Sequence, residues 1–342
     1  MSAGAAPGGF RPLPPFPDLP RERWSPRDRV SGSGQDRERR LEQPNGASAT
    51  FESPLVHRRD AFPCGWSPFS EPGGLARDSG TGAHPMSFQI LLYHGLYRER
   101  EEIRGKPARE YVSERDFRGQ VRWLRENGYS LLTLGECLSR SERGELPRRT
   151  VCLSFDDGKR SDLELAAPVL AEEGVRGTFF VIPGWLGNPN IMVPEEVRRL
   201  AGMGMEIGSH SMTHPFMSTL SQAEMDREAA DSKRFLENLV GTSVENFSYP
   251  FGDVDRRSRD AVVRAGYRTA CGTRRGANTP PWDWLLLRRW GMHETTGLEG
   301  LRRILDRGTP TLLERGADWV KRSVGTDRYV RWRERILRRA GE

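Results

Sequence analysis

The chain has 342 residues, enough for one large domain or two ordinary ones, and only 36 % of them are hydrophobic. The net charge is +6, and residues 301–342, with twelve Arg or Lys against six Asp or Glu, account for all of it. A uniformly basic nucleic-acid-binding protein is therefore excluded, and no apolar run approaches the roughly 20 residues of a membrane-spanning helix. Neither Met1 nor Met86 precedes a secretory apolar segment, which favours a cytoplasmic protein.

Residues 1–85 are expected to be disordered. Thirteen of the 24 prolines lie there, among Gly, Ser and Arg and without apolar periodicity. Such a segment cannot bury enough surface to offset its ordering entropy. Met86 precedes the first apolar run and is a candidate translation start, so we predict a domain over 86–297 and a basic helical tail over 298–342.

From residue 88 onward, short apolar runs alternate with longer amphipathic segments. This alternation predicts a parallel sheet of seven or eight strands, closed or nearly closed into a barrel. The predicted strands are 89–93, 131–134, 151–155, 178–182, 206–208, 246–249, 269–271 and 285–290. The predicted helices are 114–126, 162–173, 194–203, 222–240 and 256–265.

Reactive polar residues come directly after four of these strands. His94 follows the first, Asp156 and Asp157 follow 151–155, and His210 with His214 follows 206–208. A Pro-Phe-Gly-Asp run follows 246–249. Because the carboxyl ends of barrel strands form one face, these residues are expected on one rim.

The spacing of His210 and His214, together with the carboxylates near residue 157, predicts a metal site. Two imidazoles and a carboxylate form a facial ligand set for a divalent ion, with positions left for water and substrate. A second adjacent carboxylate can act as a base, so the pattern indicates metal-assisted hydrolysis.

Three motifs resemble those of the polysaccharide deacetylase family (the NodB homology domain, or carbohydrate esterase family 4), over roughly residues 88–292. Ser154-Phe155-Asp156-Asp157-Gly158 resembles its TFDDG motif, and residues 210–215 match HSxTHP. Residues 247–252 resemble FAYPYG. The YH-like Tyr93-His94 is similar to a permuted subgroup, the poly-N-acetylglucosamine deacetylases.

The resemblance implies a distorted (β/α) barrel with seven or so parallel strands. It also implies removal of N-acetyl groups from amino sugars of a polysaccharide or glycan precursor. It assigns Asp157, His210 and His214 to the metal, most commonly Zn²⁺, and Asp156 to the general base. The backbone N–H of Phe251 is the equivalent oxyanion donor, and Tyr249 and Trp284 are candidates to line a sugar groove together with Trp185 and Trp282.

Two roles stay open at the level of sequence. The general acid is His94 in the permuted arrangement, with His293 as the alternative, because no histidine follows residue 300. The third family motif often holds an Arg that pairs with the base, but Ser248 stands at that position. Arg289, or its neighbour Arg288, is expected to supply the positive charge instead.

Other readings of the chain also stay open. The four cysteines are scattered and are expected to be free thiols. The basic tail is typical of a solvated helix surface, although it allows weak contact with an anionic membrane. The site could hydrolyse another amide or acyl ester, or the protein could be a non-catalytic carbohydrate-binding scaffold of a polysaccharide-assembly system.

Overall fold

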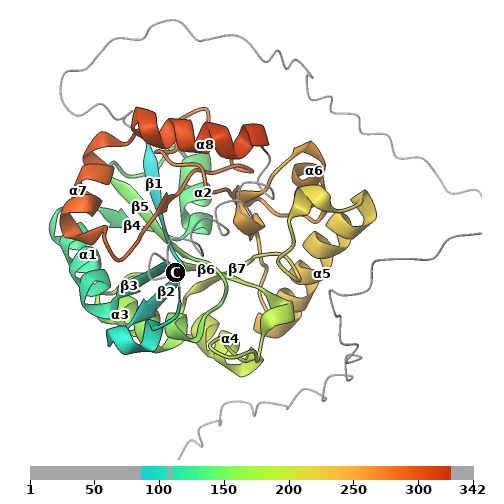
Figure 1. Cartoon of the computed structure of the whole chain (residues 1–342), viewed down its shortest axis with the longest axis horizontal. Coiled ribbons are helices and arrows are strands. Elements are labelled where there is room, and N and C mark those ends of the chain that lie inside the picture. Colours follow the sequence, from blue (N-terminus) through green and yellow to red (C-terminus); the bar gives the residue numbers. More distant parts are fainter. Residues whose placement is uncertain (1–85, 107–109, 325–342) are drawn as a thin grey trace, which may run out of the picture. The chain divides into compact units, whose positions relative to one another are not determined.

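The computed structural model describes residues 86–106 and 110–324. The segment 1–85, predicted to be disordered, and the last part of the predicted tail, 325–342, lie outside the described residues. In the described part, a curled parallel sheet is surrounded by helices (Figure 1). The alternating pattern predicted such a closed or nearly closed parallel sheet, and the resemblance implied the distorted (β/α) barrel that is observed.

Seven strands follow one another around the curl in the order β10-β1-β5-β6-β7-β8-β9, and every pairing is parallel. Their bounds are β1 (Phe88–Tyr93), β5 (Thr150–Phe155), β6 (Thr178–Val181), β7 (Glu206–Ser209), β8 (Asn246–Ser248), β9 (Thr269–Cys271) and β10 (Trp290–Gly291). The short β4 (Ser130–Leu131) pairs with the start of β5, and β2 (Gly95–Tyr97) pairs with β3 (Tyr111–Ser113) in a separate sheet. Since all seven main strands run the same way, their carboxyl ends form one rim.

The curl is closed irregularly between its first and last strands. Cys271 at the end of β9 forms a single parallel bridge with Leu287, and the chain then continues into β10 beside β1. On the other side, Phe88 bridges Asn278. Irregular segments therefore fill the place of a regular strand pair, and this distorts the barrel.

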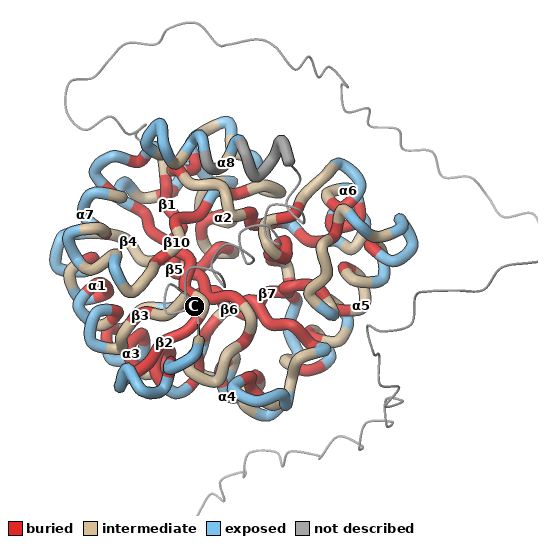
Figure 2. Tube along the Cα trace, in the orientation of Figure 1, coloured by how far each residue is buried: buried red, intermediate tan, exposed pale blue. Residues whose placement is uncertain are grey.

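Two apolar layers follow from the alternation of side chains along each strand. Leu91 and Tyr93 of β1 join the larger core cluster against the helices, whereas Ile90 joins a second cluster with Cys152 and Phe180. Both layers are fully buried, as the red strands in Figure 2 show. The sheet is therefore a rigid support for whatever its rim carries.

The helices begin and end with ordinary capping chemistry. Ser113 caps α1 and Ser221 caps α5, each by accepting a backbone N–H, and Gly241 ends α5 in the left-handed conformation. The helices are α1 (Glu114–Glu126), α2 (Leu134–Glu142), α3 (Ala167–Glu172), α4 (Pro194–Gly202), α5 (Gln222–Val240), α6 (Arg256–Arg264), α7 (Gly297–Arg307) and α8 (Leu312–Val324). Short turns of 3₁₀ helix are η1 (Arg100–Ile103), η4 (Pro183–Trp185), η5 (Met217–Thr219) and η6 (Pro250–Gly252), and η3 (Asp162–Ala166) is a π-helix that precedes α3. No described helix has the length and apolarity to cross a bilayer.

Two predictions from the sequence need correction here. The predicted strand 131–134 ends after Leu131, because Thr133 and Glu136 form a capping box that starts α2. The boundary at 297 also cuts through the domain, since Leu301 and Leu305 of α7 are buried in the larger core cluster. Helix α7 is thus part of the barrel's outer layer and not of a tail.

Candidate active site

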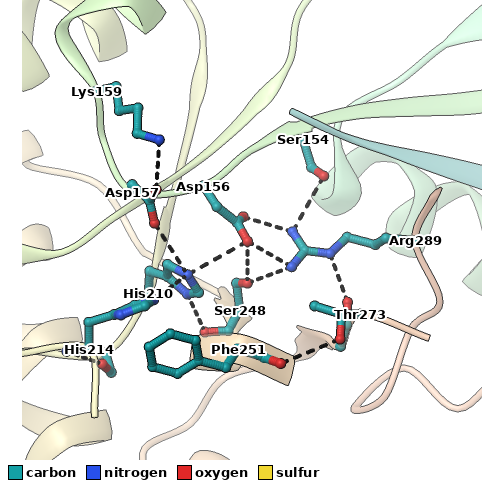
Figure 3. Close-up of polar contacts among 12 residues, drawn as sticks. Ser154, Asp156, Asp157, Lys159, His210, His214, Ser248, Phe251, Thr273 and Arg289 are labelled. Atoms are coloured by element: carbon teal, nitrogen blue, oxygen red, sulfur yellow. Dashed lines mark hydrogen bonds and ion pairs between the residues drawn. The ribbon is translucent and has the colours of Figure 1, made fainter. Parts of the chain in front are cut away.

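The polar residues singled out after the strands do gather on the carboxyl-end rim. Asp156 directly follows β5, His210 directly follows β7, and η6 lies just beyond β8. Figure 3 shows their side chains converging from these separate elements. The rim therefore holds the candidate active site.

The backbone of the rim is held in an uncommon conformation. Asp157, Ser211, His214 and Phe251 have positive φ angles of 82°, 62°, 63° and 58°. L-residues rarely adopt this region, because each such residue costs of order 1–3 kcal/mol and persists only where its surroundings impose it. Four such residues on one rim indicate that the fold accepts a loss of stability in order to orient these side chains.

The side chains of Asp157, His210 and His214 form a potential metal site. The two imidazole Nε2 atoms lie 3.2 Å apart, and Asp157 Oδ1 lies 3.8 Å from Nε2 of His210. One ligand atom from each residue lies within 4.8 Å of the other two. Two nitrogens bound tetrahedrally to zinc at about 2.0–2.1 Å would be about 3.3 Å apart, so the donor set fits a divalent ion.

Neighbouring groups fix the orientation of the two histidines. His210 Nδ1 donates to the backbone carbonyl of Ser248 over 2.7 Å, which leaves the Nε2 lone pair for a metal. The Glu228 carboxylate accepts from the backbone N–H groups of Met212 and Thr213, between the two histidines. The loop is thereby tied to α5, and both rings are positioned before any ligand arrives.

Asp156 lies in a different environment from Asp157. Arg289 donates to both of its carboxylate oxygens, at 2.7 and 2.8 Å, and the Ser248 hydroxyl donates to Oδ2 at 3.1 Å. Arg289 Nη2 also donates to that hydroxyl, and its Nε donates to the carbonyl of Gly272. Figure 3 shows Asp156 between His210 and Arg289, and the side chain of Arg289 is fully buried. Arg288, the alternative partner, is exposed.

Charges set the protonation of these groups. Burial alone would raise the pKa of Asp156, but Arg289 and His210 outweigh it and hold that pKa well below its usual range. Burial also opposes the shift of Asp157, whose pKa is lowered by Lys159, His94 and His210. Burial lowers the pKa of His214 to about 3, aided by His210. At neutral pH both carboxylates are thus ionised and His214 is neutral, the forms that bind a cation.

Lys159 is a member of the site that sequence reasoning missed. Its Nζ lies 3.1 Å from Oδ2 of Asp157 and 5.0 Å from the centre of the Tyr111 ring. The two oxygens of Asp157 therefore face different partners, Oδ2 toward the ammonium and Oδ1 toward His210. Ser248 was noted only as a departure from the family motif, yet it contacts three site residues through its hydroxyl and carbonyl. The only signal in the sequence was the proximity of these residues to the motifs.

The two candidate acids lie on neighbouring strands. His94 directly follows β1, and its charge contributes to the pKa shifts of both Asp156 and Asp157. Burial lowers the pKa of His94, although the two carboxylates oppose this. His293 comes just after β10, which pairs with β1, and its backbone N–H is bonded to Thr296.

The aromatic residues require a correction. Tyr249 has no exposed surface, packs edge-on against Phe247 and donates to the carbonyl of Leu285, so it cannot line a sugar groove. Trp284 stacks on Phe88, the first residue of β1. His94 follows the other end of that strand, about 20 Å away at 3.3 Å per residue. The prediction that Trp284 lies at the substrate site is therefore wrong.

Other aromatic rings do lie at the site. The Trp185 ring centre is 4.9 Å from that of His214. The ring centre of Phe251 lies 4.5 Å from that of His214. The Phe251 ring also stacks on the Phe216 ring, with 4.1 Å between their centres. Trp185 and Phe251 therefore flank His214, and Phe216 extends this aromatic group through its contact with Phe251.

Comparison with known proteins gives consistent matches. Residues 143–270 match the family model described as polysaccharide deacetylase. The chain is 29 % identical over 194 residues to YxkH of Bacillus subtilis, whose name marks it as a candidate polysaccharide deacetylase; this covers 56 % of the chain and 67 % of the relative. It is 25 % identical over 183 residues to a poly-β-1,6-N-acetyl-D-glucosamine N-deacetylase of Staphylococcus aureus, covering 49 % of the chain and 63 % of the relative. The matched region thus spans about two thirds of the length of these relatives.

Solved structures share the fold. The deacetylase PplD of Streptococcus pyogenes, solved with acetate, aligns with a TM-score of 0.61 and 23 % identity over 66 % of this chain and 100 % of that one. IcaB of Ammonifex degensii aligns with a TM-score of 0.57 and 21 % identity over 64 % of this chain and 97 % of that one. At this level of identity the likeness concerns the barrel alone.

Proposed function

We propose that this chain is a metal-dependent hydrolase that removes N-acetyl groups from the amino sugars of a polysaccharide or glycan precursor, in keeping with the match of residues 143–270 to the polysaccharide deacetylase model. The observation that carries the proposal is the rim itself, where one buried ionised carboxylate lies next to a carboxylate and two imidazoles suited to a cation. The staphylococcal relative, named for poly-β-1,6-N-acetyl-D-glucosamine, supports an N-acetylglucosamine polymer as substrate.

Asp157, His210 and His214 would hold the ion, which we propose to be Zn²⁺ because one oxygen and two imidazole nitrogens suit this borderline metal. When bound, it would polarise the acetyl carbonyl and favour attack by water.

Asp156 is the proposed general base. Its Oδ2 lies 3.6 Å from Nε2 of His210, so it faces the ligand side of the site. Arg289 and Ser248 fix the rotamer of the carboxylate and keep it ionised, ready to take the proton of the attacking water. Arg289 is thus a positioning residue and does not itself need to touch the substrate.

The general acid is proposed to be His94. As water adds to the acetyl carbon and the C–N bond breaks, the departing nitrogen needs a proton, which the His94 imidazolium would donate. The electrostatic interaction of His94 with both Asp156 and Asp157 supports this assignment. The backbone N–H of Phe251 is proposed to stabilise the developing oxyanion, and the rings of Trp185 and Phe251 to contact the sugar.

Acetate release from purified full-length protein tests the proposed function. N-Acetylated glycans that include β-1,6- and β-1,4-linked glucosamine oligomers should release acetate, and Asp156→Asn should lower kcat by about 10²–10⁴-fold. Zinc content should stay near that of the wild type in this variant, because no ligand is removed. Stoichiometric metal without acyl release from the whole panel would favour a carbohydrate-binding scaffold instead.

A paired substitution tests the acid. His94→Ala should lower kcat strongly without changing metal content, and should flatten the basic limb of the pH–rate profile. His293→Ala is the matched control on the neighbouring strand. If His293→Ala gives that signature and His94→Ala does not, the acid is His293.

A further inference from the structure

Helix α8 exposes large hydrophobic side chains to solvent, unlike a helix that packs by hydrophobic burial. Surface helices normally turn an apolar stripe toward the core and polar residues toward water. In α8, Leu312, Leu313 and Trp319 are 84 %, 88 % and 61 % exposed. These are three of the five large exposed hydrophobic side chains in the part of the chain that the structure describes.

The polar side of α8 is the side that holds it to the barrel. Asp318 accepts from the guanidinium of Arg275 at 2.9 Å, and Glu314, four residues earlier, pairs with Arg307 at 3.1 Å. Glu314 also forms a capping interaction with Thr311 at the start of the helix. The acidic residues are therefore turned inward and the apolar residues outward, which is costly in water unless something covers that face.

A basic hollow lies beside the start of this helix. A cavity of about 370 Å³ is lined by Arg288, Arg307 and Arg315, with Asp283 as the acidic member of its lining. Asp283 is already paired with Arg259. Arg307 is paired with Glu314, so Arg288 and Arg315 carry the positive charge of this lining. The surroundings of the apolar face are therefore positively charged.

We propose that α8 is a membrane-surface anchor, with Leu312, Leu313 and Trp319 inserted among the lipids and the adjoining arginines on anionic headgroup phosphates. Leu and Trp on one side of a short helix with basic residues beside them suit the interface of an anionic bilayer. Charge distinguishes this occupant from a second copy of the chain, because two copies meeting through this face would bring like charges together. With 13 residues, α8 is shorter than the roughly 20 residues that a helix needs to cross a bilayer.

Vesicle co-sedimentation of the full chain tests the anchor. The protein should sediment with phosphatidylcholine vesicles that contain phosphatidylglycerol, and much less with phosphatidylcholine alone. Leu312→Glu combined with Leu313→Glu should weaken binding by about ten-fold or more, because charges replace the two leucines that are proposed to enter the lipid. Arg315→Gln should weaken it by about five-fold, the worth of one basic residue at an anionic surface.

Val263→Glu is the matched control, since Val263 is 49 % exposed on α6 and carries no part of the proposal. It should bind vesicles like the wild type, and all variants should retain acetate release from a soluble oligosaccharide. Absence of binding to anionic vesicles would overturn the proposal, as would equal binding by the α8 variants. Self-association abolished by Leu312→Glu, without vesicle binding, would assign the face to a second copy and also overturn it.

Discussion

Each end of the barrel holds one carboxylate with hydrogen-bond donors, Glu206 partly buried and Asp156 buried, but the donors differ. Glu206 begins β7, and it accepts hydrogen bonds from the backbone N–H groups of Leu134 and Gly135 and from the hydroxyls of Thr133 and Thr178. At the other end of the sheet, Asp156 is paired with a buried guanidinium.

Uncharged donors and charged partners produce opposite pKa shifts. Burial raises the pKa of Glu206 despite its hydrogen bonds, whereas Arg289 overcomes burial and lowers that of Asp156. The end with Glu206 thus fastens α2 under the barrel, and the end with Asp156 keeps a reactive group ionised. The same barrel therefore uses uncharged donors where a carboxylate stabilises the fold and a charged donor where a carboxylate is proposed to react.

The largest effect should come from removing the charged partner at the rim. Arg289→Met leaves Asp156 buried without a counter-charge, which should cost about 3–5 kcal/mol of unfolding free energy and most of the activity. Arg288→Met, at the exposed neighbouring residue, should change neither. Denaturant unfolding of both variants would measure the difference, and equal losses would show that the buried pair is not special.

The same pair makes a pH prediction. The folded-state pKa of Asp156 lies below its unfolded value of about 3.9, so its stabilisation is complete above that value and is lost as pH falls through the folded pKa. Arg289→Met should remove this acid-dependent part of the stability curve. If the unfolding free energy of the wild type and that of Arg289→Met both stayed constant from neutral pH to well below about pH 3.9, the prediction would be contradicted.

Metal addition should act on the rim alone. At a zinc concentration about 100 times its Kd, the folded protein should gain about 2.7 kcal/mol, seen as a rise in Tm that a chelator reverses. Asp157→Asn should lose this response because it removes a proposed ligand. An unchanged metal response in this variant would place the ion elsewhere.

At the other end, Glu206→Gln should reduce stability without touching catalysis. One oxygen becomes an NH₂ group that faces a backbone N–H, at an expected cost of about 1–3 kcal/mol. The kcat per folded molecule should stay at the wild-type value, and Glu195→Gln on exposed α4 serves as the control. A fall in kcat would show that the two ends are coupled.

The smallest effect is expected from Ser248→Ala, which sharpens the comparison within the rim. It removes the hydroxyl that bridges Asp156 and Arg289 but keeps the carbonyl that accepts from His210. The loss should be about 0.5–1.5 kcal/mol by thermal or denaturant unfolding. A loss as large as that of Arg289→Met would make the hydroxyl the main support of Asp156.

Local sequence patterns were sufficient for the barrel and for most of the rim. Apolar periodicity and caps are local properties, so α1 and α5 could be placed to the residue, and parallel strands necessarily bring residues after β5 and β7 to one edge. For aromatic residues, no comparable local pattern predicts whether the side chain lies in the core or at the site. Tyr249 is a core residue and Trp284 lies partly buried against Phe88 because of what packs around them, which spacing along the chain does not report.

Only the tertiary structure decided how the charges pair. The Arg289–Asp156 contact joins residues 133 positions apart, and the contacts of Lys159 and Ser248 depend on side-chain directions at strand ends. The outward apolar face of α8 is likewise visible only once Asp318 and Glu314 are seen to turn inward onto arginines of the barrel. By itself the sequence determined which elements form and which reactive residues share a rim, since these follow from local periodicity. Partners across the fold follow from packing of distant segments, and that is decided in three dimensions.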